Sequence, residues 1–238
     1  MKAISYFRIT SLLLALVFIP APIIIASDIS SLLEKKGPGA KEVITRPTIS
    51  RVSEQPRLPV SLRQYEFLMD HPRLSMVLAH IYDPSLDLYK IEARPDGSIH
   101  VDDPAGLAGD MELVNSIPGR RVYFISGHFD FLKMRFNGHV VMEISYSGRL
   151  SEGPASVDST TACYIKVNSA FAGFLAKLMA FLFPKKVDER IGRFSNAVKR
   201  VAIAVHDDPD GAYQKLAASG ESGFGELKEF AAMFLRRP

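Results

Sequence analysis

Hydrophobic residues recur at helical spacing along one long stretch near the end of the chain, residues 168–207. The first half of this stretch, 171–183, is apolar on almost every side, and Pro184 predicts a kink or a break into two helices. In the second half, apolar side chains follow one another at steps of three or four residues, which places them on one side of an α-helix. We therefore expect a long helical element that covers an apolar surface. The residues of this stripe are Val187, Ile191, Phe194, Val198, Val201 and Val205.

Upstream of this stretch the hydrophobic period changes from 3.6 residues to two. Two short helices are predicted first: a capping box of Ser61 and Gln64 begins one, and Pro72 begins the other. Most connections between the later segments are short turns, whereas parallel neighbours would need long crossovers. The pattern predicts an α+β fold, in which the long helix covers one face of a curved antiparallel sheet. The predicted strands lie at 89–93, 99–101, 111–115, 122–126, 140–146 and 160–168.

Two further helices are predicted after the long one. Asp208 and Pro209 are suited to begin a short helix, and a final amphipathic segment carries Phe224, Phe230 and Phe234. We therefore divide this part of the chain into a principal domain, residues 59–207, and a carboxyl-terminal helical extension, residues 208–238.

The first 27 residues have the order of a secretory signal peptide. Lys2 and Arg8 precede an uninterrupted apolar run at 11–18, and the small residues Ala26 and Ser27 follow it. The alternative is an uncleaved anchor, because the apolar part of this segment is long enough to span a bilayer. Either reading predicts an exported domain, which is periplasmic or is anchored to the membrane and faces away from the cytosol.

Residues 28–58 show weak periodicity and several prolines, which predict a linker between the export segment and the domain. Within it, residues 48–52 could form one isolated strand. The linker would therefore carry no part of the sheet, and the domain proper would begin near Pro59.

Composition and charge restrict the function further. The chain is 47% hydrophobic and 23% charged, which predicts a buried core, and its formal net charge of +3 is not concentrated in a basic face that would bind nucleic acid. Cys163 is the only cysteine, so no intramolecular disulfide forms, and we expect it to be a small buried hydrophobe. The sequence has no nucleophile elbow, zinc-protease helix, phosphate loop or cysteine pair, and it predicts no cofactor and no metal.

The order of the predicted elements resembles the helix-grip architecture of the START-like (SRPBCC) superfamily, which includes polyketide cyclases and lipid carriers. Residues 62–72, LRQYEFLMDHP, resemble the family's first helix with its Leu-x-Asp-x-Pro ending. Residues 136–146, FNGHVVMEISY, resemble its glycine, long strand and tyrosine. The resemblance covers about residues 59–207. It departs from the family in two respects, because no strand is located before the first helices and the last helices are additional.

The resemblance implies a cavity between the sheet and the long helix that holds an apolar ligand such as a lipid, a sterol-like molecule or a polyketide. It therefore predicts an exported binding or transfer protein for a hydrophobic small molecule. The aromatic segment 171–183 is also suited to contact a membrane surface, although burial explains it with fewer assumptions. Adaptable apolar residues are expected to face the cavity, although a packed core would use the same ones: Met111, Phe124, Met142, Tyr146, Phe194 and Val198.

Two alternative functions stay open. His128 and Asp130 share one face of a predicted strand, and the return of the hairpin could bring His139 near them. Such a set could bind a metal or supply the acid and base of a cyclase-type or hydrolase-type enzyme, although such residues beside glycines are more often solvated. The other alternative is a protein-interaction module, in which the phenylalanines of the last helix would form one exposed patch.

Overall fold

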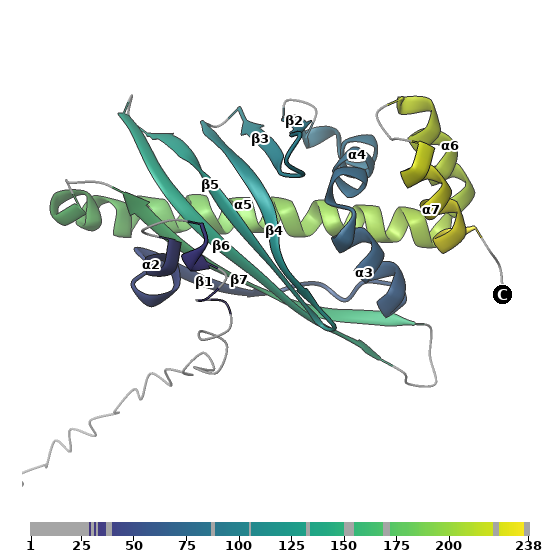
Figure 1. Ribbon diagram of the computed structural model, residues 1–238, viewed down its shortest axis with the longest axis horizontal. Helices are drawn as coiled ribbons and strands as arrows, with labels where there is room; N and C mark the ends of the chain where they lie inside the picture. The colour runs from purple at the N-terminus through teal and green to yellow at the C-terminus, as the bar shows by residue number, and fades with distance from the viewer. Residues whose placement is uncertain are drawn as a thin grey trace, which may run out of the picture.

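An antiparallel sheet with a long helix across one face organises the domain. The computed structural model describes residues 29, 31, 33–36, 40–86, 89–104, 106–131, 134–149, 155–168, 172–220 and 224–235, without the side chains of 131, 134, 149, 172–187 and 224. Within this part of the chain seven strands form one sheet, and helix α5 (Ala172–Asp207) crosses it (Figure 1). The predicted signal peptide and the side chains expected to touch a membrane lie outside the described residues.

The strands follow the predicted meander. Their order in the sheet is β1-β7-β6-β5-β4-β3-β2, so each strand from β2 to β7 pairs antiparallel with its neighbour in sequence. The predicted α+β class with a long carboxyl-terminal helix is confirmed. The strands are β1 (Ile49–Glu54), β2 (Lys90–Ala93), β3 (Ile99–Asp103), β4 (Leu107–Ile117), β5 (Arg120–Phe131), β6 (Met134–Arg149) and β7 (Ser156–Asn168).

The two predicted short helices are α3 (Leu62–Asp70) and α4 (Pro72–Tyr82), which a short 3-10 turn, Pro84–Leu86, follows. The capping box of α3 is present: the Gln64 backbone N–H donates to the Ser61 hydroxyl at 3.2 Å, and the Ser61 N–H donates to the Gln64 side chain at 2.9 Å. Both helices lie at one end of the sheet, beside the carboxyl-terminal half of α5 (Figure 1).

Helix α5 runs through Pro184 without interruption, so the predicted break into two helices is wrong. A proline inside a helix removes one backbone hydrogen bond, and the apolar stripe that follows it packs against the rest of the domain. Val201 and Val205 of this stripe are fully buried. Tertiary packing of the helix therefore outweighs the local cost of the proline.

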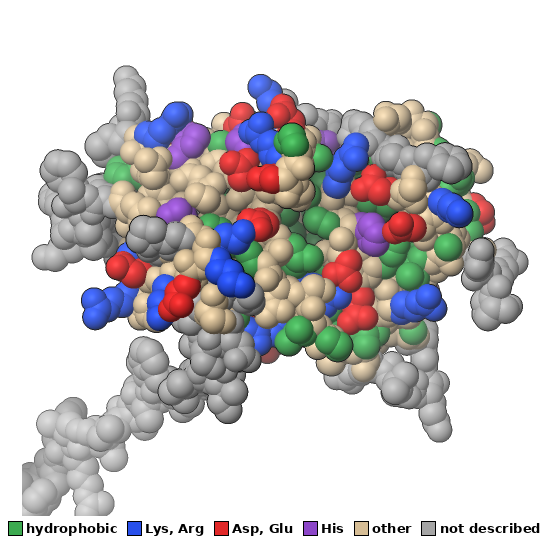
Figure 2. Space-filling view, in the orientation of Figure 1, with side chains coloured by type: hydrophobic (Ala, Val, Ile, Leu, Met, Phe, Trp, Pro, Cys, Tyr) green, Lys and Arg blue, Asp and Glu red, His purple; other side chains and the backbone are tan. Residues whose placement is uncertain are grey.

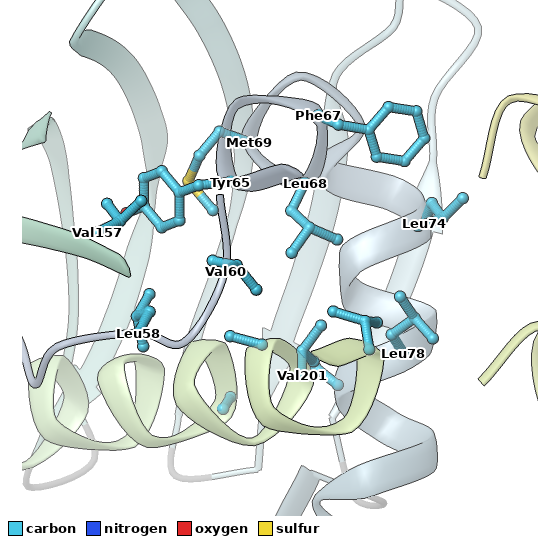
Figure 3. Packing of buried hydrophobic residues seen from close by; sticks show 14 of the residues in the cluster. Leu58, Val60, Tyr65, Phe67, Leu68, Met69, Leu74, Leu78, Val157 and Val201 are labelled. Atoms are coloured by element: carbon cyan, nitrogen blue, oxygen red, sulfur yellow. The ribbon is translucent and has the colours of Figure 1, made fainter. Parts of the chain in front are cut away.

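The main core lies between α3, α4, α5 and the inner face of the sheet, which is the face toward α5. Figure 3 shows side chains from the loop before α3, from α3 and α4, and from β7 converging above α5. Burial of this set removes large apolar side chains from water, which is the main stabilising contribution to such a fold. Its central residues include Leu58, Val60, Tyr65, Leu68, Leu74, Leu78, Val157 and Val201.

The amino-terminal segment that was interpreted as a linker forms part of the folded domain. β1 pairs with β7 over six residues and forms one edge of the sheet, so the isolated strand expected at 48–52 belongs to the sheet. Helix α2 (Ala40–Thr45) precedes it and covers the outer face, opposite α5. Ile29, Leu33 and Val43 are buried there. The linker prediction was wrong because α2 and β1 are short and bury only one or two side chains each. So few buried residues leave no clear hydrophobic period in the sequence.

Three glycines lie side by side across the inner face. Gly109 of β4 is opposite Gly127 of β5, and Gly127 is opposite Gly138 of β6. A Cβ atom added at Gly127 would lie 2.2 Å from the Ala108 carbonyl oxygen, so the neighbouring backbones approach too closely for any side chain. We call these residues the glycine row. It permits a sharp bend of the sheet over α5, because residues without side chains allow strands to curl.

The additional helices at the carboxyl terminus, α6 (Pro209–Ser219) and α7 (Phe224–Phe234), fold back onto α3, α4 and α5. Phe230 is fully buried and Phe234 is 8% exposed, so they do not form the exposed aromatic patch that an interaction module requires. The side chain of Phe224 lies outside the description. None of the described helices combines the length and the apolar character needed to cross a membrane.

Candidate functional site: an apolar surface under the long helix

A row of half-buried apolar residues lies on the inner face, directly beside the glycine row. Met111, Ile125 and Val140 stand next to one another across β4, β5 and β6. Farther along the same face toward α3, Tyr123, Met142 and Ile144 are buried. Because no side chain rises from the adjacent glycine row, this apolar row remains partly accessible although it faces a helix.

Helix α5 presents half-buried apolar residues toward the same region. Phe194 and Val198 pack against the main core and yet keep part of their surface accessible. The two strands at this edge of the sheet, β2 and β3, add Ile91 and Val101, which are half-buried on the same face. We call the whole set the inner apolar surface: Ile91, Val101, Met111, Leu113, Ile125, Val140, Ile191, Phe194 and Val198.

The structure places five of the six predicted ligand-facing residues on the inner side. Met111, Met142, Tyr146, Phe194 and Val198 all belong to the main core or pack against it. Met142 and Tyr146 are buried, whereas the other three are half-buried.

The sixth residue, Phe124, lies on the outer face, and its assignment to the cavity is wrong. It stands opposite Val141 and is buried under the amino-terminal segment, together with Val122. Tyr123, its neighbour in sequence, points inward to the main core. Side chains alternate along a strand, so the choice of inward residues on β5 depends on its register with β6.

The charged residues on the inner face stand at its margins, and each is ion-paired. Arg51 of β1 pairs with Asp188 of α5 at 3.2 Å, and Asp103 of β3 pairs with Arg190 of α5 at 2.9 Å. These two pairs connect α5 to both sides of the sheet. The described part of the inner apolar surface between them carries no ionisable side chain. A charged ligand group would therefore find no partner there and would lose its hydration.

Polar side chains missed by sequence reasoning cluster where α3 meets the sheet. Arg121 donates to both carboxylate oxygens of Asp70, at 2.6 and 2.8 Å, and its guanidinium lies over the ring of Tyr146. The Tyr146 hydroxyl donates to Glu66 at 3.2 Å. Burial raises the pKa of Tyr146 well above its usual value, despite the opposing effect of Arg121. The one available signal was a charged residue, Arg121, at an inward position of an otherwise apolar strand.

The predicted set of His128, Asp130 and His139 does not form a catalytic or metal site. All three point to the outer face, away from the inner apolar surface. His139 stands opposite Ser126, so Asp130 is displaced from it by four residues along β5, or about 13 Å. The Asp130 carboxylate is bonded to Arg135 at 2.9 and 3.1 Å, which lowers its pKa. Among the residues that the structure describes, no three histidine, cysteine or acidic side chains gather as metal ligands would.

His139 instead packs on the outer face. Its ring stacks on Phe124 with the centroids 5.4 Å apart, and its Nδ1 atom is buried without a hydrogen-bond partner. Burial lowers the pKa of His139, because the protonated ring loses hydration. Figure 2 shows the outer side of the sheet, where acidic and basic side chains are interspersed and histidines stand in several separate places.

Two hollows bordered by described residues open at the surface. One, of about 420 Å³, lies between α4 and the edge strand β2 and is lined by Val77, His80 and Ile91, among others. The other, of about 570 Å³, is lined mainly by hydroxyl and acidic side chains near the β4–β5 turn, including Glu54 and Asp158. Only the first borders the inner apolar surface, through Ile91.

Comparison with known proteins yields similarities in fold alone. No family model matches the sequence, and no curated protein matches it. The protein XoxI from Bacillus cereus is similar in structure with 14% identity and a TM-score of 0.37, over 65% of this chain and 94% of that chain. Truncated norcoclaurine synthase from Thalictrum flavum is similar with 13% identity and a TM-score of 0.41, over 64% of this chain and 93% of that chain. Another structure of that synthase contains dopamine and hydroxybenzaldehyde.

Proposed function

We propose that this protein binds an uncharged hydrophobic small molecule, such as a lipid, between the inner apolar surface and α5. The observation that carries the proposal is the half-buried row of Met111, Ile125 and Val140 beside the glycine row. Apolar side chains under a covering helix are normally buried completely, since proteins pack their interiors densely. Here they remain partly accessible, as do Phe194 and Val198 on the covering helix.

The chemistry of the lining favours an apolar ligand. Aliphatic side chains, methionine and phenylalanine make up the inner apolar surface, and such side chains adapt to ligands of irregular shape. The charged groups at the margins are already paired with one another, so they do not attract a ligand charge. The signal-like segment 1–27 supports export, and we propose that the protein binds or transfers its ligand in the periplasm or at the outer side of the membrane.

The test is native mass spectrometry combined with lipid extraction, on protein purified from the periplasmic and membrane fractions. A stoichiometric apolar molecule that co-purifies would support the proposal and identify its class. The mass of the mature chain would also show whether the amino-terminal segment is removed. An empty protein that also fails to take up lipids or sterols from a panel would refute the proposal.

A matched pair of variants places the ligand. Val140→Phe fills space on the inner apolar surface and should abolish co-purification. Val52→Phe adds the same group at an outer-face position of β1 that is 65% exposed, and it should leave co-purification unchanged. Equal ligand content in the two variants would place the ligand elsewhere.

A further inference from the structure

Three arginines on α5 contact partners along one side of the domain. Arg190 donates to the Asp103 carboxylate at 2.9 Å, and Arg193 donates to the Tyr89 hydroxyl at 3.2 Å. Arg200 lies 3.6 Å from the Asp83 carboxylate. We call these three residues the arginine row. Their partners lie at the end of β3, just before β2 and just after α4, so the first two contacts hold the edge of the sheet and the third holds the end of α4.

Two members of the arginine row, Arg190 and Arg193, hold the edge hairpin, residues 89–103. Its outermost strand, β2, has four residues and pairs with β3 alone within the described sheet. Most of β2 and of the turn after it is exposed, whereas Ile99 and Asp103 of β3 are buried. A short edge with few buried side chains is among the least stable parts of a fold.

A hollow separates the edge hairpin from α4. This hollow, of about 420 Å³, has Ile91 and Ala93 of the hairpin on one side and Val77 and His80 of α4 on the other. Side chains of α4 therefore do not hold the hairpin tightly along this margin. Ile91 also belongs to the inner apolar surface and stands opposite Val101 on β3. The hollow thus borders the inner apolar surface at Ile91.

We propose that the edge hairpin is a lid over the ligand site and that the arginine row controls its opening. This inference rests on the proposed function and names the route by which the ligand enters and leaves. Outward bending of the sheet along β3 and β4 breaks none of the ladder hydrogen bonds between these strands. It does require the contacts of Arg190 and Arg193 to separate. The hollow beside α4 then widens into a passage lined by apolar side chains.

The contact between Arg190 and Asp103 is the strongest of those that hold the lid closed, because the Asp103 carboxylate is buried. Asp103 is 3% exposed, and Arg190 provides a buried charge with its counter-charge. A hydrogen bond between charged groups with so little access to water is stronger than an exposed pair, because water competes for it less. The pair between Arg51 and Asp188 provides a natural comparison, since it connects the same helix to the opposite edge of the sheet.

The lid predicts how fast a ligand enters and leaves the site when the contacts of Arg190 or Arg193 are lost. If the contacts of Arg190 and Arg193 close the lid equally over the empty and the filled site, their loss should raise the rates of entry and exit together and leave the dissociation constant almost unchanged. In Arg190→Gln, both rates should rise about tenfold, as expected for the loss of one charged hydrogen bond. Tyr89→Phe, which removes only the hydroxyl that Arg193 reaches, should give a smaller change in the same direction.

The experiment uses stopped-flow fluorescence with N-phenyl-1-naphthylamine, an uncharged apolar probe, on the full-length protein. The control is Arg51→Gln, which should leave both rates unchanged. Hydrogen exchange without any probe should become faster in residues 89–103 of Arg190→Gln and not in Arg51→Gln. Together, faster entry, faster exit and faster exchange would establish the lid.

The remaining outcomes separate the two proposals. If the probe binds the wild-type protein and Arg190→Gln leaves its rates unchanged, the lid is refuted and the ligand site stands. If Arg190→Gln and Arg51→Gln raise the rates equally, α5 loosens as a whole and the lid is also refuted. If the wild-type protein binds no apolar probe, the proposed function fails, and the lid over that site fails with it.

Discussion

Arg121 of β5 and Asp70 of α3 form a two-point ion pair, with nitrogen–oxygen distances of 2.6 and 2.8 Å. The Arg121 side chain is almost completely buried, and its remaining donor group bonds the carbonyl oxygens of Ile117 and Arg120. One side chain therefore attaches the end of α3 to the β4–β5 turn. This connection fixes the α3 end of the sheet, where the inner face is closely packed, whereas the apolar residues beside the glycine row remain half-buried.

Replacing Arg121 with methionine should destabilise the protein. The change leaves the Asp70 carboxylate without its charged partner and removes the hydrogen bond that Arg121 donates to the carbonyl of Ile117. Asp70 keeps 37% of its side chain exposed, so water replaces part of what is lost, and we expect about 2 kcal/mol rather than the larger loss of a fully buried pair. Urea denaturation of the variant gives this value. Arg135→Met, which breaks an exposed pair with Asp130, is the control and should leave the stability nearly unchanged.

The sequence predicted which segments form helices and strands better than it predicted which face of a strand points into the main core. Period-two alternation located the meander strands, and period-3.6 spacing located α3, α4 and α5, because both patterns reflect burial of one face. Which face of β5 is buried inside depends on its register with β6, and the wrong choice placed Phe124 in the cavity. Both faces of β5 carry apolar residues here, since the amino-terminal segment covers the outer side. Alternation alone could not distinguish them.

Features made by distant contacts were harder to predict. β1 has one buried residue, Ile49, and its identity as a strand comes from pairing with β7 more than a hundred residues later. The bend at the glycine row and the pairs between α5 and the sheet edges likewise join segments far apart in sequence. The candidate histidine site failed for a different reason, because the register of the β5–β6 hairpin places Ser126 and not Asp130 opposite His139.

Replacing a glycine of the glycine row with alanine should have the opposite effect on stability from the same change in α5. In Gly127→Ala the new Cβ would lie 2.7 Å from the Gly109 Cα atom and closer still to a carbonyl oxygen, so the strands must separate. We expect a loss of about 3 kcal/mol. Gly192 lies in α5 with nothing within 4 Å of an added Cβ, so Gly192→Ala should stabilise by up to about 1 kcal/mol through helix propensity. Thermal unfolding distinguishes the two. Equal effects would mean that the row does not bring the strands together.

His139 predicts a loss of stability on mild acidification. Its pKa in the folded protein is lowered from 6.5 by burial, so the unfolded chain binds the proton more tightly. The His139 contribution is therefore fully present above pH 6.5 and is lost as the pH falls below that value toward the lowered pKa. His139→Phe keeps the stacking on Phe124 and should remove this pH dependence. The measurement is urea denaturation of both proteins between pH 5 and 8, and parallel profiles would contradict the prediction.

Glu143 should change the stability in the opposite direction from His139 as the pH falls, and a separate variant tests it. Burial raises the pKa of its carboxyl group above 4.5, although Arg120, 3.0 Å away, acts in the other direction. The folded state then binds the proton more tightly than the unfolded chain, so the penalty from the buried charge falls as the pH falls through the raised pKa. In Glu143→Gln, the decline of stability on acidification should be steeper than in the wild type. A shallower decline would show that the ion pair with Arg120 dominates over burial.

Cys163 should report on global unfolding. The thiol is buried in the main core, and burial raises its pKa to about 12, so almost no reactive thiolate exists at pH 8. We expect iodoacetamide to leave the folded protein unmodified, and labelling to increase in urea in proportion to the unfolded fraction. Intact-mass analysis measures the modified fraction at each urea concentration. Arg190→Gln loosens only the edge hairpin, whereas Cys163 lies on β7, so this variant should label as slowly as the wild type. Faster labelling there would mean that opening of the lid exposes the core itself.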